Sequence, residues 1–413
     1  MNHFKRSLGI GLWFMFLTLP LVVVRVNTLS QEVEWRWANM LWVGLAAFAI
    51  AWAWRYSIDR RAARQAQGGS QTRPLSARRS WAQRLSDDPI LSRRLLMVAA
   101  LAALAFPWLV STGQNFYHVN IMVSALIFVV LGLGLNITVG LAGLLDLGYI
   151  AFFAVGAYTY ALLSKNFDLG FWTCLPLGGV MGMFFGIVLG FPILRLRGDY
   201  LAIVTLGFGS ITKIVLENSD VLFGGAAGIA GIPRPDLFGL VLDGREKSLY
   251  SYYIVLALVA LTIFVTNRLK NSRIGWAWMA LREDEIACVA MGVDMARTKL
   301  SAYALGAFWA GLVGVIFAAH NNFINPDSFT FMDSAMILAM VVLGGMGSIL
   351  GVIIAALALK LLPEYLRAFA EYRMLVFGAV MVLMMIFRPQ GLISGLRRKY
   401  EYDAGKGSDD VGK

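Results

Sequence analysis

Long apolar segments recur along almost the whole chain and are separated by shorter polar stretches. They lie near residues 8–26, 38–54, 95–110, 119–139, 141–163, 171–194, 199–217, 250–267, 299–319, 331–361 and 373–387. About 20 helical residues cross a hydrocarbon core of roughly 30 Å, and these runs lack the period-two alternation of a membrane β-barrel. The pattern predicts an all-α polytopic membrane protein with about twelve crossings or part-crossings.

The segment 331–361 is too long for a single crossing. It carries "LGGMGS" at 343–348, near its middle, where glycines interrupt the helical pattern. Such an interruption inside an apolar segment indicates two shorter helices joined by a break. We therefore expect a helix–break–helix hairpin here.

An arginine-rich stretch divides the chain into parts. We expect a two-helix membrane extension at 1–54, a basic cytoplasmic linker at 55–94, a bundle of about ten segments at 95–395 and a disordered tail at 396–413. The first apolar segment has no small-residue cleavage site, so we interpret it as a retained helix rather than a signal peptide.

Composition agrees with a membrane protein, since 58% of the residues are hydrophobic and 15% are charged. The net charge of +11 is explained by cytoplasmic loops, which collect Lys and Arg, without invoking nucleic acid.

Loop charge predicts the orientation of the helices. Starting from the ten arginines of the linker, strict alternation of sides puts every basic loop on one side of the membrane. The inside loops are then 55–94, 195–199, 268–299 and 388–399, and the outside loops are 111–118, 218–249 and 320–330. Both termini are predicted to be cytoplasmic.

Residue types needed for catalysis or metal binding are few and scattered. Cys174 and Cys288 are the only cysteines, and His3, His118 and His320 lie far apart in the sequence. Neither a disulfide framework nor a metal or catalytic cluster is indicated. The chain has no G-x-x-x-x-G-K-[ST] loop, so we do not expect it to hydrolyse ATP or to be an enzyme.

The loop at 273–299 contains a short helical pattern. Acidic residues at 283–285 suit the first turn of a helix, apolar residues follow Ile286 at i+3 and i+4, and Gly292 suits its end. A helix this short needs a partner to pack on. Either it lies on lipid headgroups, or a separate cytoplasmic protein binds it.

This loop resembles a known motif. "EDEIACVAMG" at 283–292 is similar to the coupling motif of ABC importer permeases. Further blocks resemble the permeases of branched-chain amino acid importers, namely "GLAGLLDLGYIAFFAVGAYTYALL" at 140–163, "GFPILRLRGDYLAIVTLGFGSI" at 190–211, "VVLGGMGSILG" at 341–351 and "RMLVFGAVMVLMMIFRPQGL" at 373–392. The resemblance spans roughly 95–395. The N-terminal extension resembles the longer of the two permease subunits of these importers.

The resemblance implies a machine of several chains. The residues expected to dock into a cytoplasmic ATPase, on a coupling helix at about 281–292, are Glu285, Ile286, Ala287, Val289 and Gly292. Cys288 stands where the motif often has alanine. The implied partners are a second permease subunit in a heterodimer, two ABC ATPases and a periplasmic amino-acid-binding protein. Leucine, isoleucine or valine would cross a bacterial inner membrane, with ATP and Mg used by the ATPases and no cofactor on this chain.

Two other functions remain open from the sequence. A related importer for urea or short amides has permeases of similar appearance. An ion-coupled secondary transporter needs ionisable residues inside its spans, and Asp146 alone offers little for that role.

A polar stripe in the 199–217 segment is the candidate substrate pathway. Thr205, Gly209, Thr212 and Glu217 recur at helical spacing, with Lys213 beside them. Lys213 and Glu217 stand at i and i+4, so they are placed to pair with each other. The alternative is that the Thr205–Thr212 side lines a path for a zwitterion.

Asp146 follows "GLAG" at 140–143, where small residues allow close helix packing or local unwinding. Loop alternation places it about a turn into the next helix. We expect it either to cap that helix by accepting backbone N–H bonds or to make a polar contact at the pathway. The Gly- and Pro-rich loop at 223–239 is either a contact for a binding protein or a solvated connector.

Overall fold

The computed structural model describes residues 24–26, 33–35, 103–108, 117–193, 196, 198–235, 244–365, 378, 382 and 391–393. The chain divides into two units, Met1–Arg79 and Ser80–Lys413, with the boundary inside the predicted linker. The expectations for segment 38–54, for the linker and for the tail lie outside the described residues. So does nearly all of 373–387.

The first unit contains one short antiparallel ladder among its described residues. Strand β1 (Val24–Val26) pairs with β2 (Val33–Trp35), with Val24 opposite Trp35. The predicted helix at 8–26 is therefore wrong for its last three residues, where β-branched valines favour extended backbone.

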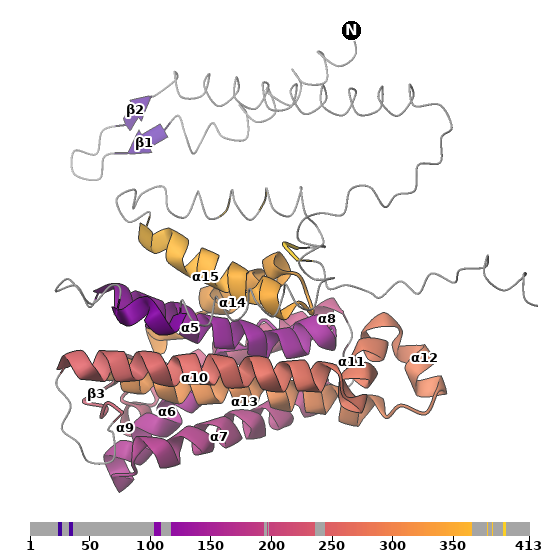
Figure 1. Cartoon of the computed structure of the whole chain (residues 1–413), viewed down its shortest axis with the longest axis horizontal. Coiled ribbons are helices and arrows are strands. Elements are labelled where there is room, and N and C mark those ends of the chain that lie inside the picture. Colours follow the sequence, from indigo (N-terminus) through magenta and orange to yellow (C-terminus); the bar gives the residue numbers. More distant parts are fainter. Residues whose placement is uncertain are drawn as a thin grey trace, which may run out of the picture. The chain divides into compact units, whose positions relative to one another are not determined.

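The second unit is built from long apolar helices (Figure 1). They are α5 (Tyr117–Leu135), which continues into a π-helical turn η3 (Asn136–Leu141), α6 (Ile150–Phe167), α7 (Phe171–Ile193), α8 (Asp199–Asn218), α10 (Gly244–Lys270), α13 (Met295–Asn321), α14 (Phe331–Gly344) and α15 (Ile349–Tyr365). Within the described ranges, six helical segments are long and apolar enough to cross a membrane. The all-α polytopic class is confirmed, and the full number of crossings stays a prediction.

Shorter elements connect these helices. They are α9 (Asp220–Phe223), η4 (Gly225–Ala227), β3 (Ile229–Ala230), α11 (Arg273–Glu283), α12 (Glu285–Ala290), β4 (Phe323–Ile324) and η5 (Pro326–Ser328). Strands β3 and β4 pair antiparallel, with Ile229 opposite Ile324.

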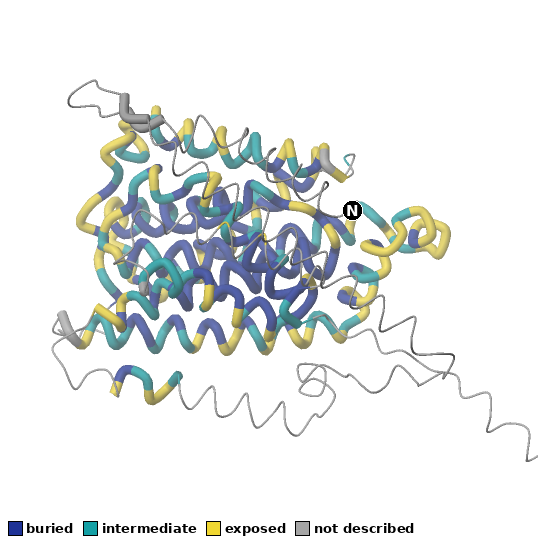
Figure 2. The backbone as a smooth tube through the Cα atoms, turned by 90° about the horizontal axis from the view of Figure 1, so that it is seen from above, coloured by how far each residue is buried: buried dark blue, intermediate teal, exposed yellow. Residues whose placement is uncertain are grey.

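Helix α13 forms the centre of the bundle and packs mainly against α6, α7 and α5. Figure 2 shows buried residues concentrated in the middle of the bundle and exposed residues at its edge. Glycines allow the closest contacts. A Cβ on Gly156 of α6 would lie 2.1 Å from the Gly311 carbonyl oxygen, and one on Gly311 would lie 2.3 Å from that of Gly178. Small residues at these positions thus allow the helices to approach closely.

The predicted hairpin is confirmed. Helices α14 and α15 are separated by a break at 345–348, in which Gly345 and Gly347 have φ of 103° and 82°. These values favour glycine because a Cβ would be strained there. The glycines of "LGGMGS" thus end one helix and allow the next to begin.

The loops gather at two ends of the second unit. The Lys270 ammonium donates to the Gly347 carbonyl at 3.0 Å, so the 268–299 loop and the hairpin break share what we call the basic end. The opposite end carries β3, β4 and η5, and we call it the ladder end. The 218–249 and 320–330 loops, which were predicted to share a side of the membrane, thus lie at the same end of the bundle.

Candidate functional site

The coupling segment, α11 and α12, forms at the basic end. Asp284 has extended backbone (φ −155°, ψ 111°), and its carboxylate accepts from the backbone N–H groups of Ile286 and Ala287 at 2.8 and 3.1 Å. This N-cap separates the two helices. The prediction of one helix over about 281–292 is therefore wrong, since Glu283 ends α11 and only Glu285 lies in the first turn of α12.

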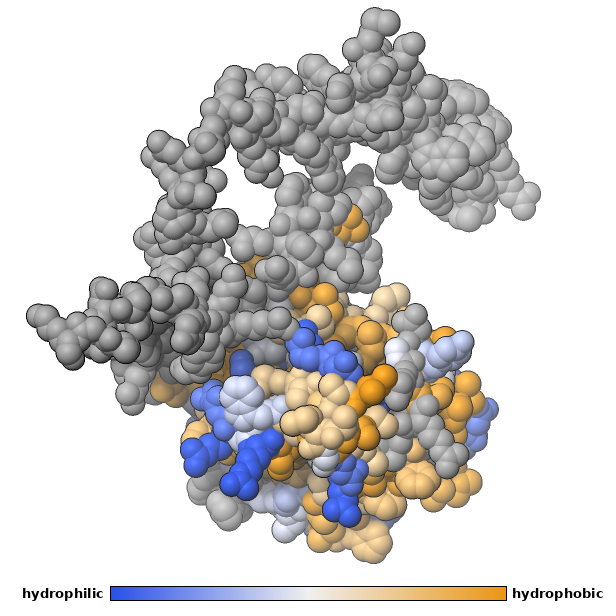
Figure 3. All heavy atoms as spheres, turned by 90° about the vertical axis from the view of Figure 1, so that its right-hand side faces the viewer, coloured by the Kyte–Doolittle hydropathy of each residue, from blue (hydrophilic) through white to orange (hydrophobic). Residues whose placement is uncertain are grey.

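The apolar face of α12 is uncovered. Ile286 is 71% exposed and Val289 is 53% exposed, while Cys288 on the other side is buried. Gly292, with φ of 83°, follows the end of the helix as predicted. Figure 2 shows the segment protruding from the bundle at the right. Figure 3 faces the same end and shows hydrophobic residues beside strongly hydrophilic ones.

A buried ion pair holds α12 against α13. The Lys299 ammonium lies 2.7 Å from a Glu285 carboxylate oxygen, and the Lys299 side chain is 1% exposed. The expected docking residue Glu285 thus also has a structural contact. Lys299 was not identified from the sequence, because a lysine beside an apolar span is common and nothing in the sequence indicates that this one is buried.

Arg282, at the end of α11, is exposed but contacts the edge of the bundle. Its Nη1 donates to the Gly140 carbonyl oxygen of η3 at 2.6 Å. Gly143, with φ of 73°, packs so closely on the arginine that a Cβ there would lie 2.7 Å from Arg282 Cγ. The coupling segment is therefore attached to the last turn of η3, and the chain leaves the helix just after it, at Ala142 and Gly143 of "GLAG".

Asp146 lies in the non-helical stretch 142–149, which we call the α5–α6 turn. It is 1% exposed, and its Oδ1 accepts from the Gly148 backbone N–H at 2.9 Å. No described residue hydrogen-bonds to its Oδ2. Helix α6 begins only at Ile150, and the side chain of its N-cap residue, Tyr149, makes no capping hydrogen bond. The expected helix start at 141 is thus wrong, and Asp146 stabilises the preceding turn rather than capping α6.

The α5–α6 turn and the first residue of α6 contact three other helices. The Leu147 N–H donates to Thr205 Oγ1 of α8, and the Ile150 N–H donates to Ser334 Oγ of α14, each at 3.0 Å. The Tyr149 hydroxyl donates to the Gly306 carbonyl of α13, also at 3.0 Å. The turn therefore links the site contacted by Arg282 to the helix predicted to carry the pathway.

A cavity of about 360 Å³ lies between α8, the α5–α6 turn and the start of α14, and we call it the α8 cavity. Its apolar lining includes Leu147, Ile150, Leu206, Ile214 and Phe329. Its polar lining comes from Ser210, Lys213, Glu217 and Thr330.

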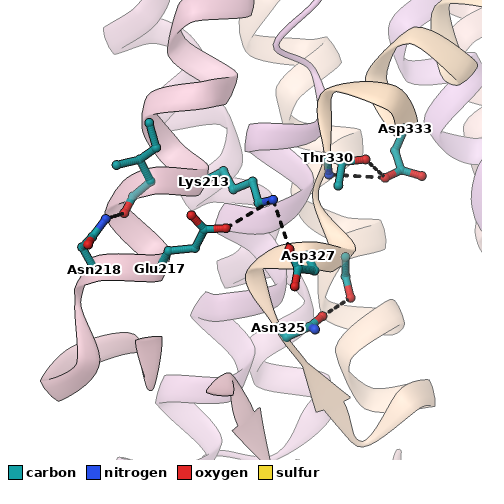
Figure 4. A network of polar contacts seen from close by, with 9 residues as sticks. Lys213, Glu217, Asn218, Asn325, Asp327, Thr330 and Asp333 are labelled. Carbon is teal, nitrogen blue, oxygen red and sulfur yellow. Dashed lines mark hydrogen bonds and ion pairs between the residues drawn. The ribbon is translucent and has the colours of Figure 1, made fainter. Parts of the chain in front are cut away.

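The charged side of the cavity is an ion-pair network (Figure 4). The Lys213 ammonium lies 3.2 Å from a Glu217 oxygen and 3.0 Å from an Asp327 oxygen of η5. Next to it, Thr330 and Asp333 form a capping box at the start of α14. The predicted Lys213–Glu217 pair is confirmed, whereas Asp327 lies too far along the chain for any spacing rule to indicate it.

The residues of the predicted polar stripe take different positions. Gly209 lines the α8 cavity and packs against Gly148. Thr205 is fully buried and bonded to the α5–α6 turn, so its side chain does not line the cavity. Thr212 is half-buried, and its hydroxyl donates to the Phe208 carbonyl of its own helix at 2.9 Å. Their pathway role stays a prediction.

A mainly helical bundle with apolar spans, an internal helix break and an uncovered capped helix between two spans defines a multi-pass membrane protein. The family described as "Branched-chain amino acid transport system / permease component" matches residues 117–385. The chain belongs to this family and is a transport component, not an enzyme.

Individual relatives support this assignment. The chain is 48% identical to the high-affinity branched-chain amino acid transport system permease protein LivM of Salmonella typhimurium, over 78% of this chain and 79% of that protein. It is 49% identical to LivM of Escherichia coli, over 74% and 76% of the two chains. It is 26% identical to the permease protein LivH of Escherichia coli, over 64% of this chain and 91% of that protein. No solved structure matches the chain.

Proposed function

We propose that the chain is the membrane-spanning permease subunit of an ATP-driven importer that moves leucine, isoleucine and valine across a bacterial inner membrane. It pairs with a second permease, and the similarity to both LivM and LivH supports such a heterodimer. Two cytoplasmic ABC ATPases and a periplasmic amino-acid-binding protein complete the machine. ATP and Mg are used by the ATPases, and this chain binds no cofactor.

The observation that carries the proposal is the uncovered face of α12. Ile286 and Val289 expose apolar surface at the end of a protruding segment. A helix lying on lipid headgroups is usually rich in Lys and Arg on its polar face. Helix α12 is six residues long and has no basic residue, which favours a protein partner over a lipid surface.

The same segment has a route into the membrane domain. The Glu285–Lys299 pair fixes α12 to α13, and Arg282 fixes α11 to Gly140. The α5–α6 turn continues from Gly140 to Thr205 on α8. An ATPase that moves α12 would therefore move the turn and α8 with it, which is how ATP hydrolysis on a partner would open and close the pathway.

Docking is tested by Gly292→Trp. Gly292 has φ of 83° and no neighbouring atom within 4 Å, so the substitution strains the end of α12 and places bulk on the docking face without a clash inside the bundle. We expect the variant to reach the membrane and to lose co-purification of the ATPase.

The matched control is Gly170→Trp at the ladder end, which also has no neighbour within 4 Å. It should co-purify the ATPase like the wild type. Retained ATPase binding by Gly292→Trp would contradict docking on α12.

A further inference from the structure

The α8 cavity has two chemically different sides. One side is lined by apolar residues, among them Leu147, Leu206 and Phe329, and the other by the Lys213–Glu217 pair. Its volume of about 360 Å³ is near the lower limit of ligand pockets, which are roughly 300–1,000 Å³. The cavity therefore suits a small solute with one apolar end and one charged end.

The charged side has capacity for both charges of a zwitterion. An ammonium has three donors, and the pairs with Glu217 and Asp327 use two of those of Lys213. The third is available for a carboxylate. Glu217 uses one carboxylate oxygen in its pair with Lys213, which leaves the other oxygen for a ligand ammonium. The Lys213 and Glu217 side chains are 29% and 35% exposed, so a ligand can reach them.

A second cavity serves as a comparison. It has about 590 Å³ and is lined by polar and charged residues that include Asn120, Arg234, His320 and Glu364. Ile121 is the one aliphatic side chain in its lining. Burying aliphatic groups is favourable only where an apolar wall replaces water, so an aliphatic zwitterion is better matched by the α8 cavity.

The apolar wall of the α8 cavity is linked to the coupling segment through the chain, because the turn that carries Leu147 follows Gly140, which accepts a hydrogen bond from Arg282. Leu147 and Ile150 are held by backbone bonds to α8 and α14. Gly209 lies so close to the turn that a Cβ on it would be 3.2 Å from Gly148 Cα. Movement of the turn relative to α8 therefore changes the shape of the cavity. A solute held there would be released by the same motion.

Resting on the proposed function, we infer that the α8 cavity is a substrate site on the transport pathway. Lys213 binds the α-carboxylate, Glu217 receives the α-ammonium, and the aliphatic side chain lies against Leu147, Leu206 and Phe329. The site thereby selects for aliphatic side-chain size within the permease itself, in addition to any selection by a binding protein.

The first test uses the complete reconstituted transporter with saturating loaded binding protein. Lys213→Met keeps the length of the side chain and removes its charge, so we expect leucine uptake to fall about tenfold, the effect of losing one charge-assisted hydrogen bond. Lys213→Arg should recover part of the uptake. Lys165→Met, at an exposed lysine at the end of α6, is the matched control and should transport normally.

The second test separates a ligand site from a merely structural ion pair. Ser210 is exposed and lines the cavity, so Ser210→Leu narrows it without disturbing buried packing. We expect this variant to lower uptake of leucine more than uptake of valine, its smaller competitor. Co-purification of the ATPase confirms assembly of every variant.

Normal leucine uptake by Lys213→Met, or an unchanged leucine-to-valine ratio in Ser210→Leu, would overturn the site. Either result would leave the proposed importer intact, provided that the wild type still requires ATP and binding protein. Loss of that requirement in the wild type would instead overturn the proposed function.

Discussion

Asp146 is the residue whose surroundings in the structure differ most from those expected from the sequence. Its place in an apolar run suggested either a helix cap or a pathway contact. In the structure it is buried in the α5–α6 turn, bonded to the Gly148 N–H, with α6 starting four residues later. The apolar run identified Asp146 as unusual, but only the backbone path shows which N–H group donates a hydrogen bond to it.

Asp146→Asn separates the hydrogen bond from the charge. The amide oxygen can still accept from Gly148, and the loss of a buried charge without a described cationic partner removes a desolvation cost. We expect stability equal to or above that of the wild type, and leucine uptake within about twofold of it. Thermal unfolding of the purified protein and uptake in proteoliposomes measure the two effects.

Asp146→Leu is the control, because it loses the bond to Gly148. It should be less stable by about 1–3 kcal/mol, the usual cost of an unsatisfied buried backbone donor. A strong loss of uptake by Asp146→Asn, in a complex that still assembles, would show that the negative charge itself acts in transport.

At the scale of elements, hydropathy located the long helices but not their interruptions. The run through 142–149 stays mainly apolar, so its pattern continues across a stretch that the structure shows to be non-helical. The hairpin break was predictable because three glycines cluster in "LGGMGS". The α11–α12 boundary was not, because Asp284 suits both a first helical turn and an N-cap.

Arg282 is expected to transmit motion from the coupling segment. Arg282→Ala removes the bond to Gly140 and leaves the face of α12 and the Glu285–Lys299 pair intact. We expect the ATPase to co-purify and ATP hydrolysis to continue, while leucine transported per ATP falls about tenfold, as for loss of one charge-assisted bond. Uptake and phosphate release are measured on the same vesicles.

Arg273→Ala provides the control for this prediction, since Arg273 is an exposed arginine at the start of the same helix. This variant should keep the wild-type ratio of leucine transported to ATP hydrolysed. An unchanged ratio in Arg282→Ala would mean that coupling does not pass through Gly140.

At the scale of the molecule, the positive-inside pattern predicted that the 218–249 and 320–330 loops share an end of the bundle, since basic loops gather on the other side of a membrane. It could not predict contacts such as Lys213–Asp327 or Arg282–Gly140, because these join elements far apart in sequence. The α8 cavity was missed for the same reason: its lining comes from three separate segments.

The orientation itself is open to direct labelling. Cys174 and Cys288 are both buried, so introduced cysteines can be read against a low background. Val221 at the ladder end is 98% exposed and Met291 at the basic end is 84% exposed. In intact spheroplasts, Val221→Cys should react with an impermeant maleimide and Met291→Cys should react only after permeabilisation. The reverse pattern would invert the orientation.

The most direct measurement of the central claim is leucine uptake by the reconstituted complex of both permeases, the ATPases and the binding protein. We predict that uptake requires ATP inside and loaded binding protein outside, and that it persists when ionophores collapse every ion gradient. Uptake driven by a proton or sodium gradient without ATP would contradict an ATP-driven importer and favour a secondary transporter.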